Sequence, residues 1–400
     1  MRQTPTEEHL KHMIERHKLY VDDLPNGMRA DFSNMNLIGI NFNDTNLHAA
    51  IFNGADVSCS TFMGAKLMCC SFKKARMVNT NLVEANLSDA KLDGAIMTEA
   101  DLTCATLIRA HFNRTNLSRS LMSRADARYT EFIYTNFKNA DISHTNFEFS
   151  NLSGSDFTGA SLSGVKMNGC SLAAAVFVKA CLDWADLRGS NLSKANLSEA
   201  RLINAILTTT NFTSANLSKA ILTEADASRA DFFKTDLTKA TLYYTILNLA
   251  RILEADLTGA NLEYADFTQA DLTHANFTGT ELDSTCLDRD LHRYLRTFCR
   301  DCPPLRTGGR IVYRTKSPIN MQGEDYKVGR TYVAPWFSFS SETACHPGIY
   351  AGSLEQLREL YPYVQCIRCY VRDGDWVITA KGFIRCKRIR VLSETPNAAD

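Results

Sequence analysis

The sequence predicts a mainly β solenoid, a fold in which short repeats stack along one axis. An apolar residue recurs at every fifth position from Phe32 to Leu287 without a change of phase, which makes 52 consecutive repeats counted in steps of five. Two positions before each central residue stands a small residue, usually Ala, with Met35, Ile40 and Val165 as the exceptions. A period of five fits neither a helix nor a single strand. A fixed repeat over this length indicates a solenoid.

Each repeat reads as a short extended segment followed by a corner. The central residue and the small residue lie two positions apart, so an extended backbone points both side chains to the same side. The residue between them points outward and is mostly Asp or Asn, whose side chains accept hydrogen bonds from nearby backbone N–H groups. One coil cannot bury its apolar side chains alone, but stacked coils bury them against one another.

The repeats share the pattern Ala, Asp or Asn, Leu, and two variable residues. Typical examples are Ala85-Asn86-Leu87-Ser88-Asp89, Ala255-Asp256-Leu257-Thr258-Gly259 and Ala265-Asp266-Phe267-Thr268-Gln269. Over residues 30–287 this pattern resembles the pentapeptide-repeat family. The resemblance implies a right-handed parallel quadrilateral β-helix in which four repeats form one square coil, and therefore about 13 coils. At a strand spacing of roughly 4.8 Å, that solenoid would be about 62 Å long.

Short helices are expected to cap both ends of the solenoid core. Residues 1–29 contain an amphipathic stretch over 6–20, for which Thr6 is a suitable N-cap. Residues 288–304 contain a second amphipathic segment, 290–298, and end in two prolines that stop a helix. Uncovered coil ends would present unpaired strand edges, so we interpret 1–29 and 288–304 as capping segments.

Residues 305–400 differ in composition and are expected to form a small basic α+β domain. The pattern predicts strands at 310–314, 331–333, 375–378 and 388–392 and a short helix at 353–360. Within about residues 308–393, the segments 325–332, 345–351 and 381–389 resemble a domain of unknown function that occurs in bacteriophage and large-virus proteins. The resemblance carries no known activity. It implies a viral origin, with the host cytoplasm as the compartment.

Composition restricts the class of protein further. The chain has no apolar run of 18 residues and no apolar signal region at its start, so we expect neither a membrane span nor secretion. The 13 cysteines are scattered rather than arranged as a disulfide framework, which indicates reduced thiols. Residues 31–290 carry 29 acids and 22 bases, and residues 291–400 carry 10 acids and 17 bases. The solenoid therefore has a net charge of −7 and the C-terminal part +7, which favours mutual attraction.

Two C-x-x-C pairs are the only candidates for a metal site in the sequence. They are Cys299 with Cys302, and Cys366 with Cys369. Four thiolates could hold zinc. However, the second pair lies in an apparent strand, where residues three apart face opposite sides, so buried thiols are the simpler interpretation. We expect no cofactor.

The C-terminal domain also holds the candidates for an enzymatic alternative. They are Arg314, Trp336, Ser338 and His346, together with the basic run Arg385, Lys387 and Arg388. Tyr313-Arg314 followed by 337–341 resembles part of an ADP-ribosyltransferase, but the Glu-x-Glu or Gln-x-Glu element is missing. The basic run fits a solvated edge, a contact with the acidic solenoid, or a phosphate-binding surface. No residue is assigned a catalytic role.

Apolar side chains at outward positions predict an interaction surface. If four repeats form a coil, residues 20 apart are neighbours in adjacent coils. The candidates are Phe233 with Leu253, Tyr244 with Tyr264, and the adjoining Tyr243 and Leu249. Tyr129 and Phe149 form a smaller pair. Clustered exposed apolar groups indicate a contact, and the occupant could be the C-terminal domain, a second copy in a homodimer, or a host protein.

Some pentapeptide-repeat proteins resemble duplex DNA and inhibit type II topoisomerases, which makes DNA mimicry an alternative function. A phosphate mimic needs dense negative charge, whereas the solenoid carries arginine on four successive corners, at positions 109, 114, 119 and 124. We therefore favour a non-enzymatic scaffold protein that binds a partner protein, with no membrane contact and no nucleic-acid partner expected. DNA mimicry and an enzyme in 305–400 remain the alternatives.

Overall fold

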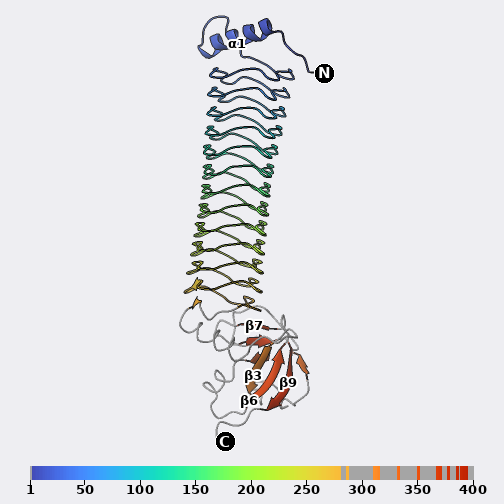
Figure 1. Ribbon diagram of the computed structural model, residues 1–400, viewed down its shortest axis with the longest axis vertical. Coiled ribbons are helices and arrows are strands. Elements are labelled where there is room, and N and C mark those ends of the chain that lie inside the picture. The colour runs from blue at the N-terminus through green and yellow to red at the C-terminus, as the bar shows by residue number, and fades with distance from the viewer. Residues whose placement is uncertain are drawn as a thin grey trace. The chain divides into compact units, whose positions relative to one another are not determined.

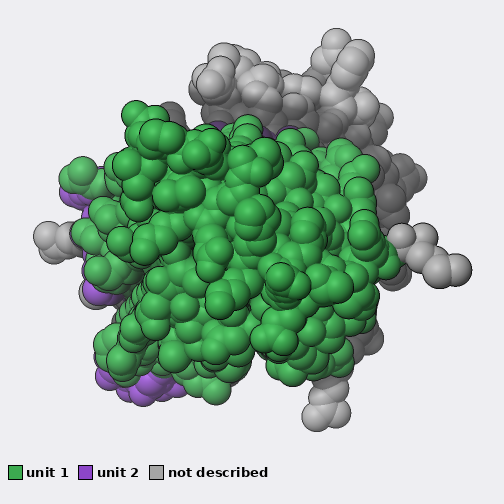
Figure 2. All heavy atoms as spheres, turned by 90° about the horizontal axis from the view of Figure 1, so that it is seen from above, with its two compact units in different colours: residues 1–230 green, residues 231–400 purple. Residues whose placement is uncertain are grey.

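The computed structural model describes residues 2–280 and 285–287, together with seven strands between Arg310 and Glu394. The chain divides into two compact units, residues 1–230 and 231–400, and each unit is considered by itself (Figure 2). The first unit contains the helix α1, Glu7–Val21, and stacked coils (Figure 1). No helix in the described part of the chain has the length and apolar character needed to cross a membrane.

Helix α1 confirms the predicted N-terminal helix. The side chain of Thr6 accepts a hydrogen bond from the backbone N–H of His9, and acidic residues occupy the first turn, as expected for a capped N-terminus. Leu10 and His17 are buried. The ring Nδ1 of His17 accepts a hydrogen bond from the backbone N–H of Ala30, directly before the first coil, at 3.1 Å. Burial lowers the pKa of His17, so the imidazole is held in the neutral form that accepts this bond.

The coils pair in parallel with a constant offset of 20 residues. Asp31 bridges Ile51, Ile51 bridges Ser71, and the series continues through the first unit to Ile206 and Asp226. Four repeats therefore complete one coil. Inter-coil hydrogen bonds are short and regular, for example 2.7 Å from the N–H of Leu87 to the carbonyl of Thr106. The predicted stacking of parallel coils is confirmed, and it satisfies backbone groups without a conventional sheet.

A tight turn follows each central residue and makes the corner of the coil. The carbonyl of Leu82, for example, accepts a hydrogen bond from the N–H of Ala85 at 3.0 Å. The second residue after the centre has a positive φ, as in Glu84 at 58°, which is the geometry of a type II turn. Only some of these corner residues are glycine. The corner positions therefore carry full side chains that project from the solenoid.

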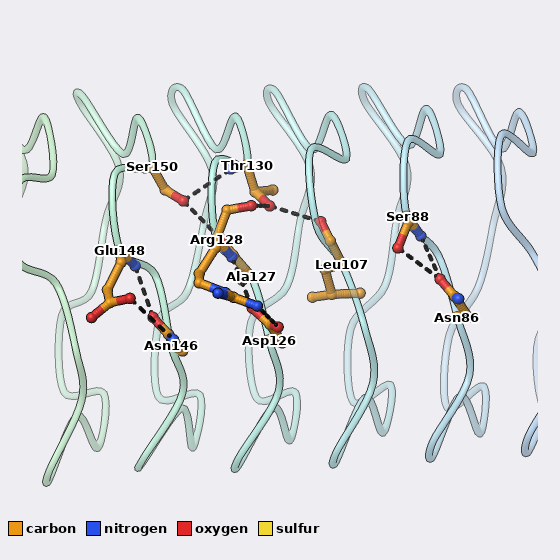
Figure 3. A network of polar contacts seen from close by, with 10 residues as sticks. All are labelled: Asn86, Ser88, Leu107, Asp126, Ala127, Arg128, Thr130, Asn146, Glu148 and Ser150. Atoms are coloured by element: carbon orange, nitrogen blue, oxygen red, sulfur yellow. Dashed lines mark hydrogen bonds and ion pairs between the residues drawn. The ribbon is translucent and has the colours of Figure 1, made fainter.

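The core consists of the central and small residues, as the five-residue pattern predicted. In the first unit the central residues are fully buried, and Phe32, Phe52 and Phe72 stack at 4.6–4.7 Å between ring centroids. Burial of each large side chain contributes about 1.5–3 kcal/mol. Where Thr or Ser replaces Ala, its hydroxyl donates to a carbonyl of its own or the preceding coil: Thr130 donates to Leu107 and Ser150 to Ala127, both at 2.7 Å (Figure 3), whereas Ser120 donates to Leu117.

The second unit contains further repeats and a group of antiparallel strands. Bridges such as Asp231 with Arg251 keep the 20-residue offset. Strand β1, Asp266–Phe267, pairs in parallel with β2, Cys286–Leu287. The remaining strands are β3 Arg310–Thr315, β4 Thr331–Val333, β5 Ile349–Ala351, β6 Cys366–Val371, β7 Trp376–Ile378, β8 Ile384–Cys386 and β9 Arg388–Glu394.

These strands form two sheets, with orders β3-β6-β9-β4 and β5-β8-β7. Strands β3, β4, β7 and β9 confirm the four strands expected from the sequence. The expected helices at 290–298 and 353–360 lie outside the described residues.

Candidate interaction surface

The 20-residue coil determines which outward side chains become neighbours. Corner residues 20 apart form a column that runs along the solenoid. Two successive corners of one coil mark the two edges of one side of that coil. The outward Asp or Asn of each repeat is held in place locally: the Oδ1 of Asn86 accepts from the N–H of Ser88 at 3.0 Å (Figure 3). Because the coil is regular, the residue number alone tells on which side and in which coil an outward side chain lies.

Three tyrosines in the second unit form one cluster. Tyr244 and Tyr264, 20 residues apart, stack with ring centroids 4.7 Å apart and planes 18° apart. Tyr243 packs edge-on against both, with centroids at 4.6 and 5.8 Å. Burial against its neighbours, followed by the charges of Tyr244 and Glu263, raises the pKa of Tyr243. The structure thus places these three predicted residues together.

The same side of the coil carries two more exposed apolar side chains. Ile246 lies between the corner residues Tyr244 and Leu249, and Tyr264 follows in the next coil. We call Tyr244, Ile246, Leu249 and Tyr264 the tyrosine face; their side chains are 42–48% exposed. Sequence reasoning missed Ile246. The sequence feature that could have revealed it is an Ile at a repeat position that is Asp or Asn in most repeats.

Phe233 and Leu253 lie elsewhere on the coil. Phe233 is ten residues, or half a coil, before Tyr243, which places it across the solenoid from that residue. Its ring packs against the Nζ of Lys234 at 4.9 Å and the guanidinium of Arg251 at 4.5 Å, a cation–π arrangement. Leu253 follows in the same column as Phe233. The predicted surface is therefore divided between at least two sides.

Acidic groups border the tyrosine face. Glu263 precedes Tyr264, and Asp266 bridges Ile246 from the next coil. Neither carboxylate makes an ion pair with a described residue. The bases Lys234 and Arg251 pair instead with Glu254 at 3.7 Å and Asp231 at 2.9 Å, on other sides of the coil. Among the described residues, the apolar face therefore lies beside acids that no base neutralises.

A second group of exposed rings occupies corners of the first unit. Tyr129 and Phe149 stack at 5.6 Å with planes 12° apart, which confirms the predicted pair. Tyr134 is 65% exposed. A Cβ at Gly154 would lie 2.5 Å from the ring of Tyr134, and one at Gly169 would lie 2.8 Å from Phe149. We call Tyr129, Tyr134 and Phe149 the aromatic band; two of its rings lie over glycine corners of the next coil.

The coil before the aromatic band has arginine at all four corners. Two of these arginines are paired: Arg109 with Asp89 at 2.8 Å and Arg119 with Glu99 at 3.0 Å. The side-chain hydrogen bonds from Arg109 lower the pKa of Asp89. Arg114 and Arg124 make no ion pair with a described residue. The aromatic band is therefore bordered by both arginines and acids, since Glu131 lies between Tyr129 and Tyr134 and Glu148 precedes Phe149.

The C-terminal candidates are only partly described. Arg314 lies in β3, Arg385 in β8 and Arg388 in β9. Trp336, Ser338, His346 and Lys387 lie outside the described residues, as do Cys299 and Cys302. Cys366 and Cys369 occupy β6, where they pair with Thr315 and Val312 of β3. Within the described part of the chain, no three His, Cys, Asp or Glu side chains are grouped as metal ligands.

Comparison with known proteins identifies the repeats. A model of pentapeptide repeats matches residues 28–62, 80–119, 120–159, 155–194, 195–232, 210–248 and 253–289. A search of curated proteins found no match.

Several solved structures are similar to this chain. HetL from the cyanobacterium Nostoc, involved in heterocyst differentiation regulation, is 24% identical, with 67% of this chain and 96% of that chain covered and a TM-score of 0.25. QnrB1, a plasmid-mediated fluoroquinolone resistance protein, is 18% identical, with coverages of 67% and 96% and a TM-score of 0.24. A Geobacillus virus E2 protein is 9% identical, with coverages of 87% and 65% and a TM-score of 0.21. Because the repeat model matches more than half of its residues, the chain belongs to the pentapeptide-repeat family.

Proposed function

We propose that this protein is a non-enzymatic scaffold of phage origin and that it binds a host protein. The resemblance of its C-terminal segment to phage domains supports the origin. In this proposal, residues 30–287 form a right-handed quadrilateral β-helix of about 13 coils between capping segments 1–29 and 288–304. The domain at 305–400 assists recognition. The site of action is the host cytoplasm.

The tyrosine face is the observation that carries this proposal. Exposed apolar groups gathered on one side of a soluble fold are typical of contact surfaces, and tyrosine is enriched among residues that dominate binding energy. The inter-coil hydrogen bonds hold the backbone beneath the face, as between the N–H of Leu247 and the carbonyl of Asp266 at 2.7 Å. Little conformational entropy is therefore lost when a partner binds.

DNA mimicry receives less support from the exterior charges. Along the columns, acids alternate with bases and pair with them: Lys179 and Lys219 both contact Glu199 at 3.8 Å. Such pairs cancel the negative potential that a phosphate mimic requires. This alternative predicts inhibition of DNA supercoiling by gyrase, and we expect none at micromolar protein. The enzymatic alternative in 305–400 rests on sequence alone.

Affinity capture from bacterial lysate tests the proposal. Three full-length baits are compared: the wild type, Ile246→Asp in the tyrosine face, and Tyr134→Ala in the aromatic band as a matched exposed control. We expect a protein that the wild type and Tyr134→Ala retain equally and that Ile246→Asp retains at least about tenfold less. Equal recovery with all three baits, or no specific protein at all, would contradict the proposed role of this face.

A further inference from the structure

The chemistry around the tyrosine face indicates what kind of partner it accepts. We propose that this face binds a cationic segment of another protein, and that this segment has apolar side chains flanked by Lys or Arg. This inference rests on the proposed function. The apolar side chains would pack on Ile246 and Leu249 and against the tyrosine rings. The basic side chains would meet Glu263 and Asp266.

The dimensions of the face fit a single secondary-structure element. It spans two adjacent coils, and two coil spacings amount to about 10 Å. An α-helix with its side chains has a similar diameter, about 10–12 Å, so one helix or one extended segment would cover all four residues. The central position of Ile246 between two corner residues would make it the most enclosed part of the contact, where binding energy concentrates.

The charge over the face has one sign. Residues 231–280 contain seven acids and three bases. Two of the bases, Lys234 and Arg251, are neutralised by Glu254 and Asp231. The third base, Lys239, is a corner residue three repeats before Glu254 and thus belongs to another column. Among the described residues no base pairs with Glu263 or Asp266, and their field would accelerate encounter with a basic partner.

This sign of charge argues against a symmetric dimer, nucleic acid and anionic lipid as occupants. A second copy that docked through the same face would bring Glu263 and Asp266 against acidic groups of the same kind, and like charges across an interface cost free energy. Nucleic acid and anionic lipid would meet the same repulsion. The aromatic band provides a partial contrast, because arginines that make no ion pair with a described residue, as well as the acids Glu131 and Glu148, border it. A cationic segment should therefore distinguish between the two surfaces.

Selection from a random peptide library on the full-length protein tests this inference. Peptides bound to the wild type are counter-selected on Ile246→Asn, which removes the apolar side chain without adding charge, so that only peptides dependent on the tyrosine face remain. We expect those peptides to contain more Lys and Arg than Asp and Glu. Face-dependent peptides that are neutral or acidic would overturn the inference while the proposed function stands. Failure to recover any face-dependent peptide would overturn both.

A second measurement isolates the acidic border. The dissociation constant of one selected peptide is measured by fluorescence anisotropy on the wild type, on Glu263→Gln/Asp266→Asn, and on Tyr134→Ala. Asn at 266 can still accept the hydrogen bond that Asp266 receives from the N–H of Thr268, so the turn is preserved. We expect about tenfold weaker binding to the double variant and no change with Tyr134→Ala. Unchanged binding to the double variant would overturn the role of the acidic border.

Discussion

The aromatic band and the tyrosine face are built on the same backbone and differ in their surroundings. Each contains a pair of rings 20 residues apart in one column, with centroids at 5.6 Å for Tyr129 and Phe149 and 4.7 Å for Tyr244 and Tyr264. The band follows a coil with four arginine corners, and two of its three rings, Tyr134 and Phe149, lie over glycine. The tyrosine face adds two aliphatic side chains and is bordered by acids. The coil thus determines spacing, whereas the residues at outward positions determine which partner fits.

The largest expected effect concerns the core that both surfaces share. Phe147 and Leu247 are fully buried central residues next to Phe149 and Leu249. Replacement by Ala leaves a cavity, so Phe147→Ala should lower the free energy of unfolding by about 3–5 kcal/mol and Leu247→Ala by about 2–5 kcal/mol. Urea unfolding monitored by circular dichroism measures both. A loss at only one position would show that the two surfaces do not rest on equivalent packing.

A smaller effect is expected from the hydroxyl below the aromatic band. Ser150 donates to the carbonyl of Ala127 and accepts from the N–H of Thr130 at 2.9 Å. Ser150→Ala removes both contacts inside the fold and should cost about 1–3 kcal/mol. Ser193→Ala, at an outward position where only the backbone N–H of the serine bonds a described side chain, is the control and should cost less than about 0.5 kcal/mol. Equal costs for the two variants would contradict the buried hydroxyl's role.

Glycine corners provide a test that is specific to the aromatic band. Gly154 and Gly189 both have positive φ, so Ala at either site pays the same left-handed penalty of about 1–2 kcal/mol. Only at Gly154 would the new Cβ meet a ring, that of Tyr134, whereas Gly189 has one side-chain atom at 3.8 Å. Gly154→Ala should displace Tyr134, seen as a changed ring NMR signal. An unchanged signal, or the same change with Gly189→Ala, would contradict the placement of the ring.

The smallest effect is electrostatic and depends on pH. The side-chain hydrogen bond from Arg128 lowers the pKa of Asp126 below its ordinary value of 3.8. A carboxyl with a depressed folded-state pKa stabilises the fold above its unfolded pKa, and that contribution is lost as the pH falls through the folded value. Between about pH 6 and pH 2, the wild type should lose more stability than Asp126→Asn, by less than about 1 kcal/mol. Equal losses in urea unfolding would contradict this pairing.

Much of the fold could be predicted because the repeat has only one consistent geometry. The five-residue phase from Phe32 to Leu287 indicated a solenoid, and the coil of four repeats that the family resemblance implied predicted both ring stacks. The side on which a residue lies was less easily predicted. Phe233 and Tyr243 are close in sequence and half a coil apart. Ile246 occupies a repeat position that is Asp or Asn in most repeats. The rings of Tyr134 and Phe149 lie over Gly154 and Gly169 because of their side-chain rotamers, which the repeat pattern does not encode.

Hydroxyl-radical footprinting of the complex with the captured partner tests the binding surface most directly. Tyrosine rings react readily when exposed, and the chain offers rings on both surfaces for comparison within one sample. If the tyrosine face is the contact, the partner should reduce oxidation of Tyr244 and Tyr264 severalfold and leave Tyr129 and Tyr134 unchanged. Protection of Tyr129 and Tyr134 with no change at Tyr244 and Tyr264 would contradict the assignment and place the contact on the aromatic band.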